Sequence, residues 1–431
     1  MKSVRSRVMA VLVQNGLWRK GAQVSSQLRR AAVLVACLYV SALGIFPANS
    51  QQAVPARPKI GLITSLSGQS AYIGTDIRDG FLLAMARESR LLGREIADII
   101  IRDDGMLPDK GLEQFRDLQK TENIRLFAGF VSTDIAVLAV PEMVKSGALY
   151  VSPNAAPNAL SGKACHPNYF VMSFQNDSMV EIAAGFASQK GYSRAYILSA
   201  SYQAGQEAAS GFRQHFKGTV VGQSSVSFGQ TDFSAELKKI HEAKPDVVLQ
   251  FLPGSLGLNF LRSFQEARMS DKIAIVLPAS ALDHRMTAIA GSSAAGVFVT
   301  SHWNVDFANE ANRAFVSEWQ AKYNRPPTLY AMQGYDTGLA MAAAVVGAGG
   351  ATDDPQAIAR ELRKADFRSP RGPFRFGRNQ HPVQDWWLLS VKKNAQGQYQ
   401  LSTESKLKSI HSDSYADQCI LPELPHAPSP T

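Results

Sequence analysis

The sequence lacks the motifs by which most enzymes are recognised. Its 431 residues contain no nucleophile elbow, P-loop, HExxH or paired-cysteine motif. Gly61, Gly68 and Gly74 do not have the spacing of a dinucleotide-binding fingerprint, and the loop 65–70 lacks the lysine of a P-loop. The histidines are scattered singly, and no histidine or cysteine set has metal-ligand spacing. The sequence therefore predicts no enzyme, no cofactor and no metal site.

Charge is sparse and unevenly placed. Charged residues make up 19% of the chain, and the net charge is +9. Seven basic residues lie in residues 1–50, which contain no acid, so taking them from +9 leaves +2 for the rest. A nearly neutral body gives no support to a nucleic-acid partner. With 45% apolar residues, a chain of this length suffices for two or three compact units.

The N-terminal region has no apolar run of membrane-spanning length, but it has the pattern of a secretory signal. The run Ala31–Phe46 is shorter than the ~20 residues that a spanning helix needs. It follows the basic flank and precedes Ala48 and Ser50, small residues placed for a cut after Ser50. We therefore expect residues 1–50 to be a cleaved signal peptide and the mature protein to be periplasmic. An uncleaved anchor, or a start at Met9 or later, remains an alternative.

Cysteine is scarce. Leu34–Cys37 matches a lipobox, but few apolar residues precede Cys37 and more follow it, so we do not expect lipid anchoring there. With the signal removed, Cys165 and Cys419 remain. One such pair in an exported chain predicts a disulfide, with two free thiols as the alternative.

From Lys59 onward, short apolar runs of strand length alternate with segments of helical periodicity. Strands are predicted at 60–63, 99–101, 126–130, 149–151, 195–198, 247–251, 273–277, 297–300 and 386–391. Helices are predicted at 75–89, 110–122, 133–145, 179–190, 206–216, 233–242, 256–267, 285–290, 309–323, 330–346 and 354–365. Strict alternation of this kind indicates parallel sheets covered on both faces. The two series predict an α/β fold with two doubly wound parallel-sheet lobes.

Doubly wound sheets bind ligands at the carboxyl ends of their strands. The loops expected there are rich in small polar residues and proline: 64–70, 131–134, 152–157, 199–205, 253–257 and 278–283. Ser132 and Thr133 lie between a strand and a helix, where free backbone N–H groups favour a carboxylate; a helix cap alone is the alternative. Asn154, in the next loop, is a second candidate, although such a loop can simply shape a turn. Trp303 is a candidate for an apolar pocket wall, with core packing as an equal alternative.

Three segments resemble the branched-chain amino-acid-binding proteins of ABC importers, which are periplasmic binding proteins with the type I two-lobe fold. The segments are KIGLITSLSGQSAYIGTDIRDGFLLA, GFVSTDIAVLAVPEMVKSGALYVSPNAAPNAL and PPTLYAMQGYDTGLAMAAA, and the resemblance runs from about Lys59 to about Val391. It implies three crossings between the lobes, which form a three-segment hinge. It places lobe 1 at 57–173 and 301–383, lobe 2 at 174–300, and the hinge return with the second part of lobe 2 at 384–410. A C-terminal tail follows at 411–431.

The resemblance also implies how a ligand carboxylate is held. Thr133 occupies the position of the serine that binds the ligand carboxylate in the family, and Ser132 is adjacent to it. Asn154 and Ala156 fall in the next loop, where the family has small or hydroxyl residues. These positions imply that lobe 1 binds a ligand carboxylate in the same way as lobe 1 of the family's proteins.

The tyrosines of the family's site are displaced. A first-loop tyrosine is replaced by Ile73, with Tyr72 adjacent. A tyrosine of the first lobe-2 loop is replaced by Ala204, with Tyr202 two residues earlier, and a second lobe-2 tyrosine falls near 252–253. These changes imply a different ligand body.

The partner of the ligand ammonium is also missing. The glutamate that serves this role in the family falls near Ala279 and Ser280, and Asp283 would replace it only if the loop were shifted. A buried ammonium without a partner costs several kcal/mol, which is enough to abolish micromolar binding. The residues therefore argue against a standard amino acid.

Together these features predict a non-enzymatic, exported solute-binding protein. We expect a monomer that delivers a small organic ligand to an ABC importer permease, with no nucleic-acid partner. An organic carboxylate, with aromatic acids among the candidates, suits the site. A neutral amide or urea-like ligand is the alternative within this class, and a ligand-sensing receptor for a signalling partner is the alternative outside it.

Overall fold

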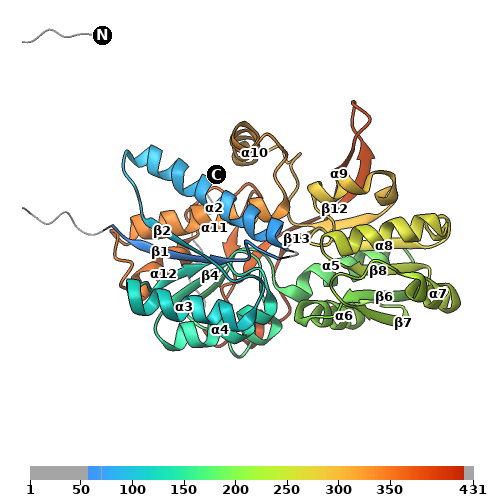
Figure 1. The fold of residues 1–431 in the computed structure, drawn as a ribbon, viewed down its shortest axis with the longest axis horizontal. Coiled ribbons are helices and arrows are strands. Elements are labelled where there is room, and N and C mark those ends of the chain that lie inside the picture. Colours follow the sequence, from blue (N-terminus) through green and yellow to red (C-terminus); the bar gives the residue numbers. More distant parts are fainter. Residues whose placement is uncertain (1–56, 69, 422–431) are drawn as a thin grey trace, which may run out of the picture. The chain divides into compact units, whose positions relative to one another are not determined.

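The computed structural model describes residues 57–68 and 70–421, which form two sheets that are each covered by helices (Figure 1). The predicted signal peptide and Cys37 lie outside these residues. Within the described part of the chain, no helix is long and apolar enough to cross a membrane.

The first sheet is parallel throughout, with the strand order β2–β1–β3–β4–β5. Its strands are β1 (Lys59–Thr64), β2 (Asp98–Asp103), β3 (Leu126–Ala128), β4 (Leu149–Ser152) and β5 (Tyr169–Val171). One face packs against α2 (Ala71–Leu92), α11 (Leu329–Gly347) and α12 (Pro355–Lys364), and the other against α3 (Pro108–Glu122) and α4 (Thr133–Lys145). Two apolar cores, one on each face, hold this sheet.

Helices α2 and α11 approach closely because glycines lie at their contact. A Cβ atom on Gly80 would come within 2.0 Å of Ala331 O, and one on Gly334 within 2.1 Å of Ile77 O. This contact joins α11, from late in the chain, to the first sheet.

The second sheet has a parallel centre and an antiparallel edge. Its order is β11–β12–β10–β9–β8–β6–β7, with β13 paired to β12. The strands are β6 (Arg194–Ala200), β7 (Thr219–Val226), β8 (Val247–Phe251), β9 (Ala274–Pro278), β10 (Phe298–Ser301), β11 (Arg375–Phe376), β12 (Pro382–Lys393) and β13 (Tyr399–His411). Strands β6 to β10 run parallel, whereas β12 is antiparallel to β10 and β13 to β12.

Both faces of this sheet are also covered. One face packs against α5 (Asn176–Gln189) and α6 (Gln203–His215), and the other against α7 (Ser234–Ala243), α8 (Ser255–Glu266) and α9 (His284–Ala290). The remaining helix α10 (Glu310–Tyr323) packs into the second of these cores through Phe315 and Trp319. Short 3-10 turns complete the described elements: η1 (Asn158–Leu160), η2 (Met269–Asp271), η3 (Gly291–Ala294) and η4 (Ala416–Gln418). The predicted fold of two doubly wound α/β lobes is confirmed.

The prediction of 386–391 as the last strand was wrong, because β12 is longer and β13 follows it. β12 and β13 form an antiparallel hairpin, paired from Lys393↔Tyr399 to Gln384↔His411. The chain from 399 to 411 thus belongs to the second sheet.

Three segments join the two sheets: one after β5, one after β10 and one before β12. Arg371 is buried at this junction, where its Nε lies 2.7 Å from Asp336 Oδ2 and its Nη1 donates to Gln384 Oε1 at 2.7 Å. Gln384 Nε2 in turn donates to Ser173 O at 2.9 Å, so the first and third segments are bound to each other. The residue numbers of the lobe boundaries stay a prediction.

The C-terminal part is fixed by a disulfide between Cys165 and Cys419, with Cα atoms 5.7 Å apart. The predicted pairing is confirmed. Tyr415, near the same end, donates its hydroxyl to Asp177 Oδ2 at 2.7 Å. The start of the predicted tail is therefore anchored to the loop after β4 and to α5.

Candidate ligand-binding site

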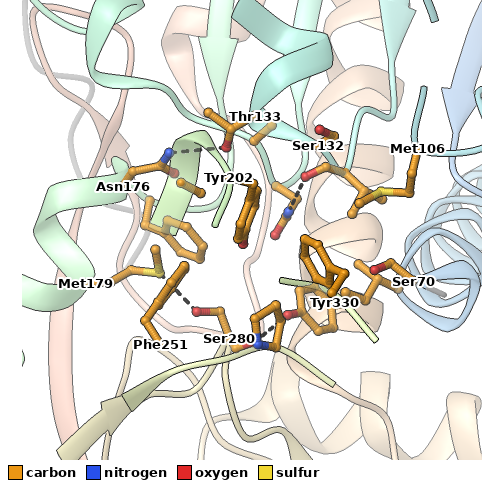
Figure 2. Close-up of a pocket in the computed structure, with 18 residues that line it drawn as sticks. Ser70, Met106, Ser132, Thr133, Asn176, Met179, Tyr202, Phe251, Ser280 and Tyr330 are labelled. Carbon is orange, nitrogen blue, oxygen red and sulfur yellow. Dashed lines mark hydrogen bonds between the residues drawn. The ribbon is translucent and has the colours of Figure 1, made fainter. Parts of the chain in front are cut away.

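In each sheet there is one strand from which the chain adds the next strand on one side and the following strand on the other. β1 lies between β2 and β3, and β6 lies between β7 and β8. The loops that follow such neighbouring strands diverge and leave a crevice, which is where doubly wound sheets bind ligands. The loops after β1 and β3 and those after β6 and β8 line one shared cavity (Figure 2). The space between its protein atoms, including the part that is open to solvent, is about 510 Å³.

The loop after β1 is held in place by two acids at the end of β2. Asp103 Oδ1 accepts from Leu66 N at 2.8 Å, and Asp104 Oδ1 accepts from Ser65 Oγ at 2.5 Å. Although burial acts to raise the pKa of the Asp103 carboxyl, hydrogen bonds from Ser67 and from backbone N–H groups hold it well below its usual range. Asp103 is therefore a charged anchor for the loop that leads to Ser70 in the cavity wall.

One end of the cavity is formed by the start of α4. Ser132 precedes this helix and Thr133 begins it, and both residues line the cavity (Figure 2). The first amide groups of a helix have no intrahelical acceptor, and the Ser132 side chain makes no capping hydrogen bond to them. The partial positive charge of the helix start and these N–H groups suit an anion.

The hydroxyl of Thr133 belongs to a short hydrogen-bonded chain. Asn176 Nδ2 donates to Thr133 Oγ1 at 3.3 Å and to Glu207 Oε2 at 2.7 Å. Burial raises the pKa of the Glu207 carboxyl, and the charge of Asp177 adds to this effect. This chain links α4 on the first sheet to α6 on the second.

Asn154 has only one of its polar atoms paired with protein. Its Nδ2 donates to Val131 O at 2.9 Å, whereas its Oδ1 is buried and has no partner among the described residues. The bond to Val131 O fixes the orientation of the amide. Asn154 thus offers an acceptor and one further N–H at the polar end of the cavity.

Aromatic rings supply much of the opposite wall. Tyr202 lies 5.1 Å from Phe228 and 6.4 Å from Phe251 between ring centroids, the latter pair nearly parallel at 16°. Phe174, from the segment after β5, and Met179, from α5, complete this apolar surface. Such a wall favours a flat apolar ligand body through burial and ring stacking.

The floor of the cavity is closed by contacts between α11 and the loop after β9. The Tyr330 hydroxyl donates to Ser280 O at 2.7 Å, and Ser280 Oγ lies 3.2 Å from Met179 Sδ (Figure 2). Ser280 is thus already engaged on both its hydroxyl and its carbonyl.

No charged side chain lines the cavity among residues 57–68 and 70–421. Asp283, the acid considered as a partner for an ammonium, is buried and caps the start of α9, where its Oδ1 accepts from Met286 N at 3.0 Å. Burial raises its pKa to about 6, with the charge of Asp76 adding to the effect. Asp283 therefore acts as a helix cap outside the cavity.

A family model described as a periplasmic binding protein matches residues 58–397. The chain belongs to this family. Leu/Ile/Val-binding protein homolog 6 of Brucella melitensis is 25% identical over 368 residues, which are 84% of this chain and 94% of that protein. The predicted resemblance to type I periplasmic binding proteins is confirmed.

Solved structures show the same fold. A solute-binding protein of an ABC transporter from R. palustris, in complex with benzoate, is 29% identical with a TM-score of 0.79, covering 85% of this chain and all of that one (100%). A solute-binding protein from Rhodopseudomonas palustris BisB5, in complex with 3,4-dihydroxy benzoic acid, is 23% identical with a TM-score of 0.74, covering 83% and 98%. The second likeness shows the fold alone.

This periplasmic binding protein brings seven of the predicted site residues to one cavity. They are Ile73, Ser132, Thr133, Asn154, Tyr202, Ala204 and Ser280. They come from both sheets, as expected for loops at the carboxyl ends of parallel strands. Whether they touch the ligand stays a prediction.

Three other predicted site residues do not line the cavity of this periplasmic binding protein. Trp303 is buried in the core, where its Nε1 donates to Asn312 Oδ1 at 2.7 Å. Tyr72 packs edge-on against the wall residue Tyr330, with ring centroids 6.1 Å apart, and is not itself part of the lining. Ala156 is buried, and its carbonyl accepts from Asn176 N at 3.1 Å. Whether these three residues contact the ligand stays a prediction, although none of them is part of the cavity lining.

Several wall residues escaped the sequence analysis because the strands before them were not recognised. Phe174, Asn176 and Met179 follow β5, and Phe228 follows β7. Neither strand was predicted, so their carboxyl-end loops were not searched. Tyr330 lies in a segment that carried the family resemblance, although no role had been given to it.

Proposed function

We propose that this protein is an extracytoplasmic receptor that binds a small aromatic carboxylate and delivers it to an ABC importer. The observation that supports this most is the polarity of the cavity. Its end at α4 offers hydroxyl and N–H donors, and its wall is aromatic and uncharged among the described residues. Benzoate bound by the R. palustris relative has the same two halves, an acid and a ring.

The acid would lie at the start of α4. The Ser132 and Thr133 hydroxyls and the amides beside them supply donors at this end. A hydrogen bond to a charged oxygen contributes roughly 1.5–3 kcal/mol. The ring would then lie against Tyr202 and Phe251, where burial and stacking favour it.

A zwitterionic amino acid fits this cavity poorly. Its ammonium would need a carboxylate or several acceptors, and the acid nearest in sequence to the family's partner position, Asp283, is engaged at α9. Leaving an ammonium unpaired in a buried site costs several kcal/mol. We therefore do not propose for this chain the leucine, isoleucine or valine ligand that the name of the Brucella relatives states.

The remaining parts of the proposal concern partners and location. We infer a periplasmic protein that acts as a monomer, has no catalytic activity and presents its closed, loaded form to a membrane permease. These features accord with a family of transport receptors and with a cavity whose described lining contains no acid–base pair.

Thr133→Ala tests the proposal at its polar end. The loss of one hydrogen bond to a charged oxygen should weaken benzoate binding roughly tenfold or more. Isothermal titration calorimetry with benzoate measures this effect. Thr121→Ala is the matched control, because Thr121 is an exposed residue of α3 whose hydroxyl donates to Asp117 O. Equal benzoate affinity in Thr133→Ala and the wild type would contradict the assignment of the acid to this end.

A further inference from the structure

Glu207 is a buried acid that does not line the cavity, yet it is connected to it. Its side chain is 6% exposed and accepts three hydrogen bonds. Gln203 Nε2 donates to Oε1 at 2.9 Å, while Asn176 Nδ2 and Asn158 N donate to Oε2 at 2.7 and 3.3 Å. Because every partner is a donor, Glu207 serves here solely as an acceptor.

This acceptor fixes the orientation of the Asn176 amide. Both N–H bonds of Asn176 Nδ2 have an acceptor, one at Glu207 Oε2 and the other at Thr133 Oγ1. A flipped amide would place its oxygen 2.7 Å from a carboxylate oxygen, which is repulsive. Glu207 therefore decides which Asn176 atom faces Thr133.

The direction of this chain of bonds determines what Thr133 offers to a ligand. Its hydroxyl oxygen accepts from Asn176, and no described residue accepts the hydroxyl proton. Since Thr133 lines the cavity, that proton is available to an acceptor in the cavity. We propose that Glu207, acting through Asn176, is a positioning residue that makes Thr133 an obligate hydrogen-bond donor to an anionic ligand oxygen. This inference rests on the proposed binding of a carboxylate.

The three residues come from different parts of the fold. Thr133 begins α4 on the first sheet, Asn176 begins α5 after the first joining segment, and Glu207 lies on α6 of the second sheet. Asn158 N, from η1 after β4, bonds to the same oxygen of Glu207 as Asn176. The hydrogen bonds that orient the Thr133 hydroxyl therefore all form when the first sheet with its helices contacts the second sheet with its helices.

A double-mutant cycle separates this relay from a purely structural role. Benzoate affinity is measured by calorimetry in the wild type, Glu207→Ala, Thr133→Val and the double variant. Glu207→Ala should weaken benzoate roughly threefold to tenfold in the wild-type background, because the Thr133 hydroxyl loses its fixed direction. In the Thr133→Val background, where no hydroxyl remains, the same change should have less than about a twofold effect.

Two further variants sharpen the test. Glu207→Gln keeps an acceptor oxygen for Asn176 and should bind benzoate within about twofold of the wild type. Glu236→Ala is the matched control, since Glu236 is also buried and accepts from a glutamine, Gln230 Nε2, at 2.9 Å but lies outside the cavity lining. Should Glu207→Ala not fold, Asn176→Ala supplies the same cycle with Thr133→Val.

Equal weakening by Glu207→Ala in both backgrounds, or none in the wild-type background, would overturn the relay and leave the proposed function intact. Absence of binding to both benzoate and 4-hydroxybenzoate in the wild type would instead overturn the relay together with the proposed function.

Discussion

Asp283 caps the start of α9 and is 2% exposed, so its charge is costly in the folded protein. One carboxyl oxygen accepts from Met286 N, and the other has no hydrogen-bond partner among the described residues. Burial, with the nearby charge of Asp76, raises the pKa of this carboxyl to about 6. At a given pH, the carboxyl of Asp283 is therefore protonated to a greater extent in the folded protein than in the unfolded chain.

This pKa predicts how stability depends on pH. Between the unfolded value of 3.8 and the folded value of about 6, the folded state binds more protons, so stability falls as pH rises. Asp283→Asn keeps the capping oxygen and removes the charge. Its unfolding free energy relative to the wild type should therefore rise by roughly 2 kcal/mol between pH 4 and pH 7. Urea unfolding at the two pH values measures this difference, and a constant difference would show that Asp283 is not perturbed by its surroundings.

For single residues, the sequence predicted which polar side chains belong to the site more readily than it predicted their positions relative to the ligand. Ser132 and Thr133 stood out because hydroxyl residues between a strand and a helix mark a helix start. Trp303 was a candidate because of its aromatic ring. In the structure its indole N–H donates to the buried Asn312, and this contact depends on three-dimensional packing that the sequence pattern does not reveal. Asn176 gave no local signal, because its role depends on Glu207, which lies more than thirty residues away in sequence (separation 31).

Edge strands explain most of the missing elements. β5 and β7 lie at the edges of their sheets, and β13 pairs only with β12. β5 has only three residues. The exposed positions of β7, and those of β13 apart from Ile410, carry polar or charged side chains, so none of the three strands presents a long apolar run. The central strands are buried on both faces and were therefore recognised by their continuous apolar sequence.

The disulfide fastens the end of the chain to the first sheet's side of the molecule. It joins residues 254 apart in sequence, Cys165 beyond η1 and Cys419 beyond η4. A crosslink over so long a loop removes conformational entropy from the unfolded chain, by roughly 5 kcal/mol in the loop-closure estimate. Measured effects are often smaller, because the denatured chain keeps some structure.

Cys419→Ser should therefore lower the free energy of unfolding by several kcal/mol, with roughly 5 kcal/mol as the upper value. Urea unfolding with and without a reducing agent measures this loss. The wild type should lose stability on reduction, and the variant should not respond to the reductant. Unchanged stability of the wild type after reduction would show that contacts such as Tyr415 with Asp177 already hold this end.

At the scale of the whole molecule, two similar sheets place their crevices against one cavity. The alternation of strands and helices predicted the two lobes, because parallel strands must be joined by crossover helices, whereas a shared ligand site between the lobes was implied by the family resemblance. The match to periplasmic binding proteins over residues 58–397 agrees with it. The closing contacts, such as Tyr330 with Ser280, join segments far apart in sequence and could not be predicted from local patterns.

The ligand class is also a property of the whole cavity. Lobe-1 loops supply donors at α4, and second-sheet loops supply rings at Tyr202 and Phe251. Neither half alone distinguishes an amino acid from an aromatic acid. The distinction arises because the described cavity wall pairs an anion-binding end with no carboxylate that could pair with an ammonium.

Calorimetric titration of the wild-type protein with benzoate and with leucine tests this central claim most directly. An unpaired buried ammonium costs on the order of 3 kcal/mol or more, so benzoate should bind at least about a hundredfold more tightly than leucine. Leucine binding as tight as, or tighter than, benzoate binding would contradict the account.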